Sequence, residues 1–132
     1  EALAGGKKNV FISFAAEDMN EVNLLRAQAK NDNSDIEFND HSVRAPYDSK
    51  RAEYIREKIS ERIKRCSTTV VYLSDSTAQS RWVKWEVEQS LKLGKAVIAV
   101  HAGAKYSGKK PEWLQKNGIK AVPWAKLATK LK

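Results

Sequence analysis

The sequence contains a single cysteine, Cys66, so an internal disulfide is excluded. It has only two histidines, and it has no closely spaced set of Cys and His residues of the kind that binds zinc. No hydrophobic run reaches the roughly 18 to 20 residues that cross a bilayer, and the first residues lack the apolar segment of a signal peptide. We therefore expect a soluble, cytoplasmic protein with no metal site and no membrane contact, in which Cys66 packs inside the fold.

Glycine-rich phosphate-binding motifs are also missing. Neither GxGxxG nor a P-loop occurs, which argues against a dinucleotide-dependent dehydrogenase or an NTPase. The net charge of +8 would suit an anionic partner. However, the basic residues are spread along the chain, without a nucleic-acid-binding motif or interleaved stacking aromatics. We therefore expect no nucleic-acid partner.

The chain of 132 residues has the size of one compact domain. Residues 1–7 begin with Glu and contain a glycine pair, so we interpret them as a linker or a cloning remnant. Residues 8–132 are then expected to form a single domain.

Short runs rich in β-branched or aromatic residues alternate with helical patterns. This alternation predicts a parallel sheet with helices on both faces. The five expected strands are residues 9–14, 35–40, 68–74, 96–101 and 119–124. Such a chain suggests a flavodoxin-like, doubly wound α/β sheet of five parallel strands in the order 2-1-3-4-5. In this fold a ligand binds beyond the carboxyl ends of the strands, near the first and the third.

The helical patterns carry their own end signals. Asp18 is placed to cap the first helix, and Gly94 to end the third, which is expected over about residues 80–93. Pro111 can open a short helical turn. A final amphipathic segment is expected to contain Leu127 and Leu131.

The stretch SRWVKWE, residues 80–86, places a carboxylate where an apolar side chain is expected. At about 100° per residue, Glu86 falls within the apolar arc of the third helix, whereas Lys84 lies on the polar side. A buried charged carboxylate needs a partner or a pocket. Two interpretations are open from the pattern alone: Glu86 is satisfied inside the fold, by a hydroxyl, a backbone amide or Arg81, or it faces a pocket and has a chemical role.

The sequence resembles a Toll/interleukin-1 receptor (TIR) domain, specifically the TIR-like family of bacterial Thoeris antiphage defence systems. The similarity lies in VFISFAAED at residues 10–18, NDHSV at residues 39–43 and the central block at residues 55–100. Within that block, SRWVKWE is similar to the TIR pattern Ser-x-Trp-Cys-x-x-Glu, with Val83 in place of the usual Cys.

In enzymatic TIR domains the glutamate of that pattern is the catalytic residue that cleaves the nicotinamide–ribose bond of NAD. The resemblance therefore assigns this role to Glu86, with NAD as a substrate and no resident cofactor. The other product is ADP-ribose if NAD is hydrolysed, or a cyclic ADP-ribose if the product cyclises. In Thoeris-like systems the resemblance implies a cyclic ADP-ribose signal that activates a separate effector. The resemblance also implies self-association through TIR-like surfaces.

Other candidate binding residues surround the same end of the expected sheet. Phe14 and Trp82 offer aromatic surfaces to nicotinamide or adenine, and the backbone around Ala15 can approach the ribose or the phosphates. Asp40 and Ser42, beyond the second strand, offer partners for hydroxyls. Each has a structural alternative: both aromatic side chains suit core packing, and Asp40 and Ser42 suit a capped loop.

Two other functions stay open. A non-catalytic TIR-like interaction module is favoured by the departures from the family pattern, Val83 and the alanines that follow Phe14. A phosphoreceiver-like domain shares the expected sheet topology, and Glu17, Asp18 and Asp75 come near the acidic arrangement that it needs.

Overall fold

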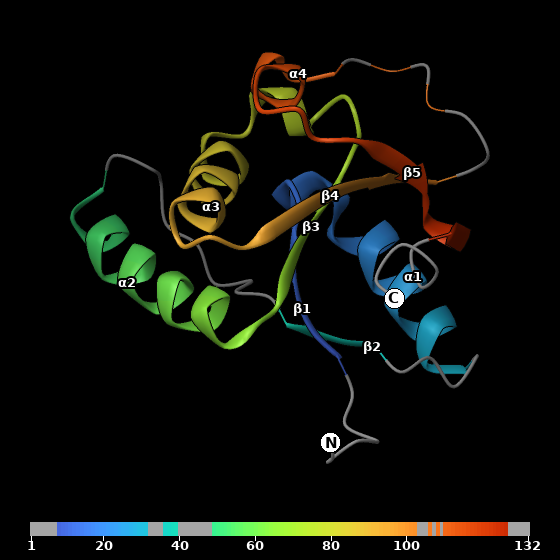
Figure 1. Cartoon of the computed structure of the whole chain (residues 1–132), viewed down its shortest axis with the longest axis horizontal. Helices are drawn as coiled ribbons and strands as arrows, with labels where there is room; N and C mark the ends of the chain where they lie inside the picture. The colour runs from blue at the N-terminus through green and yellow to red at the C-terminus, as the bar shows by residue number, and fades with distance from the viewer. Residues whose placement is uncertain are drawn as a thin grey trace.

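The computed structural model describes residues 8–31, 36–39, 49–102, 106, 108 and 110–126. These residues form an α/β fold in which a parallel sheet is covered by helices on both faces (Figure 1). The predicted fold class is confirmed at this level. Among the described residues, no helix is both long and apolar enough to span a membrane.

The sheet has five strands in the order β2-β1-β3-β4-β5, and every neighbouring pair is parallel. The strands are β1 (Lys8–Ser13), β2 (Ile36–Asn39), β3 (Thr68–Tyr72), β4 (Ala96–His101) and β5 (Ala121–Pro123). From β1 the chain first adds β2 on one side and then β3 on the other side. The order of connection therefore switches between β1 and β3, which is where a doubly wound sheet binds its ligand.

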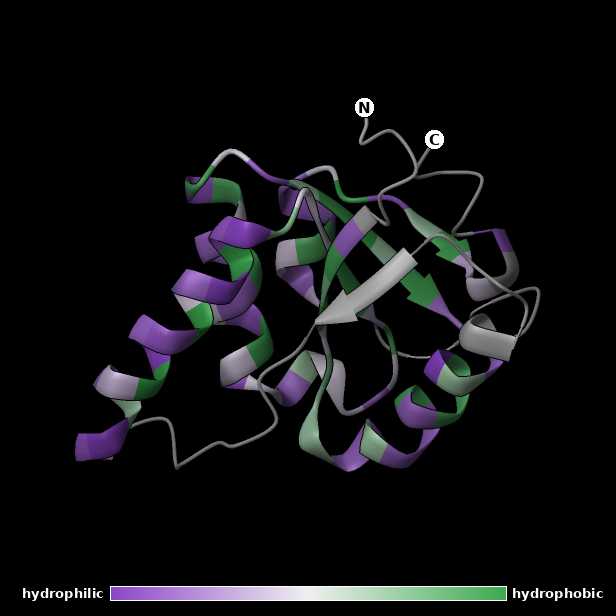
Figure 2. Cartoon of the chain, turned by 90° about the horizontal axis from the view of Figure 1, so that it is seen from below, coloured by the Kyte–Doolittle hydropathy of each residue, from purple (hydrophilic) through white to green (hydrophobic). Residues whose placement is uncertain are grey.

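In the described part of the chain, four α-helices and two single 3₁₀ turns connect the strands, and a third 3₁₀ turn follows β5. The α-helices are α1 (Met19–Asn31), α2 (Lys50–Arg65), α3 (Arg81–Lys92) and α4 (Glu112–Lys116). The 3₁₀ turns are η1 (Ala16–Asp18), η2 (Thr77–Gln79) and η3 (Trp124–Lys126). In Figure 2 the hydrophobic residues of α2 lie toward the rest of the molecule, and hydrophilic residues cover its outer side.

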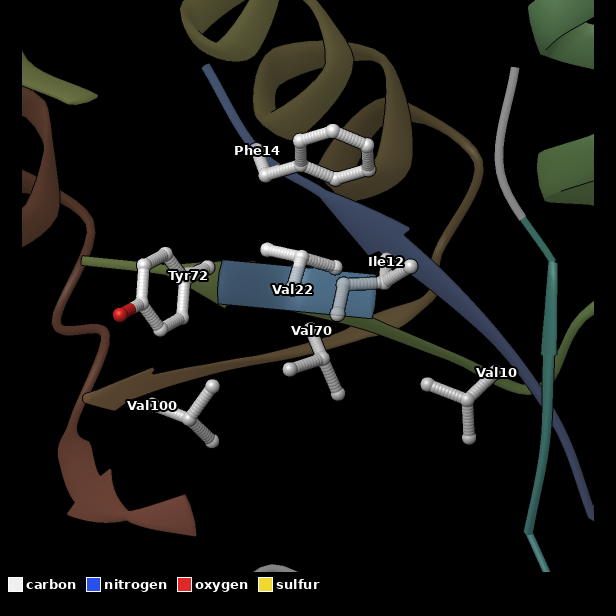
Figure 3. Packing of buried hydrophobic residues seen from close by; sticks show 7 residues of the cluster. All are labelled: Val10, Ile12, Phe14, Val22, Val70, Tyr72 and Val100. Atoms are coloured by element: carbon white, nitrogen blue, oxygen red, sulfur yellow. The ribbon is translucent and has the colours of Figure 1, made fainter. Parts of the chain in front are cut away.

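Alternation along β1 divides the core between the two faces of the sheet. Val10 and Ile12 pack with Val22 of α1 on one face, as Figure 3 shows. Phe11 packs with Ile59 of α2 on the other face. Because side chains alternate along a strand, Ser13 follows Phe11 toward the face that α2 and α3 cover.

Several element ends differ from the prediction. The strand predicted to reach residue 74 ends at Tyr72, because Ser74 begins a turn in which its N–H donates to Thr77 Oγ1 at 2.9 Å. The last strand covers fewer residues than 119–124. Its predicted first residue, Ile119, instead donates its N–H to the Leu114 carbonyl at the end of α4.

The ends of α3 agree with the sequence. Ser80 caps its start, since its hydroxyl accepts a hydrogen bond from the Val83 N–H at 3.2 Å. Gly94 follows its end with φ of +76°, a conformation that glycine adopts without steric cost. Pro111 precedes α4 as expected. Leu127 and Leu131 lie outside the described residues.

Candidate functional site

Glu86 projects from α3 into the interior of the protein. Its side chain has 0% exposure, and its neighbours on the same helix face, Trp82, Val83 and Val87, are also buried. The hydroxyl of Ser13, the last residue of β1, donates a hydrogen bond of 2.5 Å to Glu86 Oε1. The periodicity therefore placed Glu86 on the correct face, and in this structure a buried hydroxyl contacts its carboxylate.

Two hydrogen bonds in series connect the main chain of Glu86 to β3, the strand next to β1. Ser90 Oγ, one turn further along α3, donates to the Glu86 carbonyl at 2.7 Å. The same oxygen lies 2.7 Å from Thr69 Oγ1 of β3. Since the Ser90 proton is directed to the carbonyl, the Thr69 hydroxyl is left as the donor to Ser90. Adjacent strands thus hold both the side chain and the backbone of one residue.

Sequence reasoning did not single out Ser13. The signal that could have found it is the alternation in VFISF, which puts Phe11 and Ser13 on one face of the strand and Phe14 on the other. A buried serine at the end of a strand that is otherwise apolar on that face needs a polar partner. Glu86 is that partner.

Phe14 and Trp82, expected near one ligand, lie in different parts of the core. Phe14 is 2% exposed and belongs to the cluster that packs against α1. Trp82 is 8% exposed and packs with the cluster of Phe11 and α2. Its ring meets Trp85 edge to face, with 6.3 Å between ring centroids, and the Arg56 guanidinium lies 5.7 Å from its centroid. The two candidate aromatic surfaces are therefore on opposite faces of the sheet.

The remaining predicted binding residues are placed only in part. Ala15 is fully buried, and its carbonyl accepts a hydrogen bond from the Asp18 N–H at 2.9 Å. Asp40 and Ser42 lie outside the described residues. Among the described residues of the predicted site, Phe14 and Trp82 lie apart, and Glu86 is bonded to Ser13, a residue outside the predicted set.

A second buried carboxylate, Asp18, occupies the rim of the sheet. It is 7% exposed and directly precedes α1, and it accepts a 2.5 Å hydrogen bond from the Ser74 hydroxyl beyond β3. Burial raises the pKa of Asp18 above its ordinary value of 3.8, the bond from Ser74 opposes this change, and the charges of Glu21 and Glu17 add to it. Asp18 thus joins two loops at the carboxyl ends of β1 and β3.

Tyr72 extends this rim. Its hydroxyl donates to Glu21 Oε2 at 2.6 Å, and burial, followed by the bond to Glu21, raises its pKa well above the ordinary range. By contrast Asp75 is exposed. Within the described part of the chain, no three His, Cys, Asp or Glu side chains gather in a way that could hold a metal ion. Within this part of the chain, Asp18 and Asp75 therefore do not belong to an acidic cluster of the kind that a phosphoreceiver-like domain uses.

An open groove of about 590 Å³ lies on the outer side of α3, between this helix and α4. It has the size of a small-molecule pocket. Its walls carry both signs of charge, with Arg81, Lys84 and Lys116 close to Glu88 and Glu112. Glu86 does not line this groove, because its side chain leaves α3 on the side of the sheet.

Comparisons with solved structures support the fold. The chain is similar to the TIR domain of the Toll-related receptor TRR-2 from Hydra magnipapillata, with 17% identity, coverage of 92% of this chain and 88% of that one, and a TM-score of 0.60. It is also similar to the CMP N-glycosidase BcmB of Clostridium botulinum, with 14% identity, 94% and 98% coverage, and a TM-score of 0.57.

The TIR domains of the activated Roq1 resistosome give 19% identity, 75% and 60% coverage, and a TM-score of 0.51. At these identities the likeness concerns the fold. No curated protein matches the chain. The sequence itself is more informative, because residues 11–107 match the family model described as Thoeris protein ThsB, TIR-like domain. The chain therefore belongs to the family of Thoeris ThsB TIR-like domains.

Proposed function

We propose that this chain is an NAD-cleaving TIR-like enzyme with Glu86 as its catalytic carboxylate. The observation that carries the proposal is a glutamate on the sheet-facing side of α3, fully buried and hydrogen-bonded to the end of β1, within a chain of the Thoeris TIR-like family. A buried acid near the ligand-binding end of a doubly wound sheet is a candidate catalytic group.

The chemistry fits a single carboxylate. The bond between ribose C1′ and the nicotinamide nitrogen breaks, and its electron pair leaves with nicotinamide, which becomes neutral. Positive charge develops on the ribose, as in glycoside cleavage, and the carboxylate of Glu86 stabilises it. A water molecule, or a nucleophilic oxygen or nitrogen of the same ADP-ribose, then bonds to C1′, and a proton is released to the solvent. The first route gives ADP-ribose and the second gives a cyclic product.

Access to Glu86 requires a change in the protein. Its side chain is 0% exposed in the single chain, so NAD cannot touch the carboxylate in this conformation. We attribute the opening to self-association, which is common among TIR domains. Released nucleotide product then serves as the signal for a separate effector.

The binding residues remain part of the proposal. Phe14, Ala15, Asp40, Ser42 and Trp82 are its candidate contacts with NAD. Because Phe14 and Trp82 pack on opposite faces of the sheet, at least one of the two rings must move if both are to contact the same substrate. Replacing each ring separately by leucine would therefore identify which of them affects the KM for NAD.

The test is nicotinamide release from NAD, followed by chromatography at concentrations where the protein self-associates. Glu86→Gln keeps the side-chain shape but removes the charge, and we expect release to fall by at least about 100-fold. Glu88→Gln makes the same change on the exposed side of α3 and should retain wild-type release within about twofold. Equal release by wild type and Glu86→Gln would show that this mechanism is wrong.

A non-catalytic interaction module is the second candidate. The observation that favours it is the same burial of Glu86, since a carboxylate bonded inside the fold can serve stability alone. Concentration-dependent self-association without any nicotinamide release, in wild type as in Glu86→Gln, would support this function.

A further inference from the structure

We propose that Ser13 is the positioning residue of Glu86: its hydroxyl holds the catalytic carboxylate toward the end of β1, and this bond persists when the site opens to NAD. This inference rests on the proposed function and adds a residue to it. It starts from the 2.5 Å hydrogen bond between Ser13 Oγ and Glu86 Oε1, which joins residues 73 positions apart in the sequence.

The backbone of Ser13 is held firmly. It ends β1, a strand with β2 on one side and β3 on the other, and it is paired in register with Val71 of β3. Its side chain is 0% exposed and points to the face where Phe11 packs against α2. The position of the Ser13 Cβ is therefore set by the pairing of β1 within the sheet.

The nearby hydroxyls do not duplicate this role. Ser90 donates to the main-chain carbonyl of Glu86, and Thr69 is bonded to Ser90. These two residues hold the helix backbone, whereas Ser13 holds the carboxylate itself. A glutamate side chain has three rotatable bonds, so a fixed backbone does not by itself set the orientation of its carboxylate.

Loss of the hydrogen bond between Ser13 and Glu86 should affect the transition state more than substrate binding. A hydrogen bond between a hydroxyl and a buried carboxylate is among the stronger ones in proteins, and it preorganises the charge at no cost during the reaction. Its loss removes one of the contacts that orient the carboxylate. The turnover number kcat should then fall, while KM, which reflects contacts elsewhere on NAD, stays nearly constant.

The experiment measures kcat and KM for nicotinamide release by the self-associated protein. We expect Ser13→Ala to lower kcat by about 10- to 100-fold, with KM changed by less than about threefold. Ser13→Thr keeps the hydroxyl and suits a strand, so it should recover most of the lost kcat. This recovery separates positioning from mere packing.

A matched control is Thr77→Val. Thr77 is also 0% exposed, and its hydroxyl donates to the Tyr72 carbonyl at 2.7 Å. The substitution removes a buried hydroxyl away from Glu86, so it should lower thermal stability but leave kcat within about twofold. If Ser13→Ala does not fold, Ser13→Cys replaces it, since a thiol has a similar size but donates weakly.

The outcomes separate the two proposals. If Glu86→Gln is inactive but Ser13→Ala, or Ser13→Cys in its place, keeps the wild-type kcat, NAD cleavage by Glu86 stands and the role of Ser13 is wrong. A lowered kcat that Ser13→Thr does not recover also overturns positioning through the hydroxyl. If Glu86→Gln keeps full activity, the proposed function itself fails.

Discussion

Glu86 and Asp18 are two buried carboxylates with the same kind of partner and different surroundings. Each accepts a 2.5 Å hydrogen bond from a serine on a distant segment, Ser13 for Glu86 and Ser74 for Asp18. Glu86 comes from a long helix and faces the interior, whereas Asp18 comes from the single turn η1 at the rim, with acidic neighbours. A short serine–carboxylate bond is therefore not by itself evidence of catalysis.

The surroundings distinguish the two residues. Glu86 is anchored through its side chain to β1 and through its backbone to β3, and its segment SRWVKWE resembles the TIR pattern that ends in glutamate. Asp18 ties the loop after β1 to the turn after β3. We therefore expect changes at Glu86 to affect catalysis and changes at Asp18 to affect stability.

The largest expected effect is the contrast between two equivalent amide substitutions. Glu86→Gln should lower nicotinamide release by at least about 100-fold, whereas Asp18→Asn should keep it within about threefold, because Asp18 contacts no reacting atom in the proposal. Steady-state assays of both purified variants test this. A comparable loss in Asp18→Asn would remove the distinction between the two carboxylates.

A smaller effect is expected on stability at the rim. Ser74→Ala removes the donor to Asp18 and leaves a poorly hydrated carboxylate, so the free energy of unfolding should fall by about 1 to 3 kcal/mol. Urea denaturation measures this change. Ser67→Ala is the control, because Ser67 is exposed and bonds only weakly to the Asn9 carbonyl at 3.3 Å; it should change the free energy by under about 0.5 kcal/mol. Equal changes in both variants would contradict a structural role for Ser74.

The smallest effect is a pH dependence at Asp18. Burial raises the pKa of this carboxyl in the folded state above 3.8, so the folded protein holds the proton more tightly than the unfolded chain. Its contribution to stability is thus fully present below pH 3.8 and is lost as the pH rises through the raised pKa. The Asp18→Asn variant has no titrating side chain at this position.

The difference in unfolding free energy, wild type minus Asp18→Asn, should therefore fall as the pH rises. Denaturation at several pH values between about 3 and 7 measures it, and other titrating groups largely cancel in the difference. A difference that rises with pH would mean that the Ser74 hydrogen bond outweighs burial.

The layout of the fold could be predicted from the sequence because the apolar runs are strong. β3 and β4 begin at Thr68 and Ala96, as expected from two nearly continuous apolar segments. The residues at which β3 ends and β5 begins were less predictable from the sequence. The bond between Ser74 and Thr77, and the bond from Ile119 back to α4, depend on local turn geometry that residue periodicity does not contain.

The candidate site was predictable only where one element decides it. Helical periodicity alone turns Glu86 toward the sheet, and its complete burial confirms this. Its contact with Ser13 depends on how α3 lies across β1, which no local pattern specifies. Side-chain alternation along β1 places Phe14 on the opposite face of the sheet from Trp82, and the choice of both rings as candidate NAD contacts did not take this into account. The NAD contacts of Asp40 and Ser42 stay predictions.

The most direct test of the central claim is the amount of nicotinamide released from NAD by the self-associated protein with Glu86 intact and with Glu86→Gln. Our account predicts sustained release by the wild type and a loss of at least about 100-fold in the variant, at equal self-association. Release that is undiminished in Glu86→Gln, or absent from both proteins despite self-association, would contradict it.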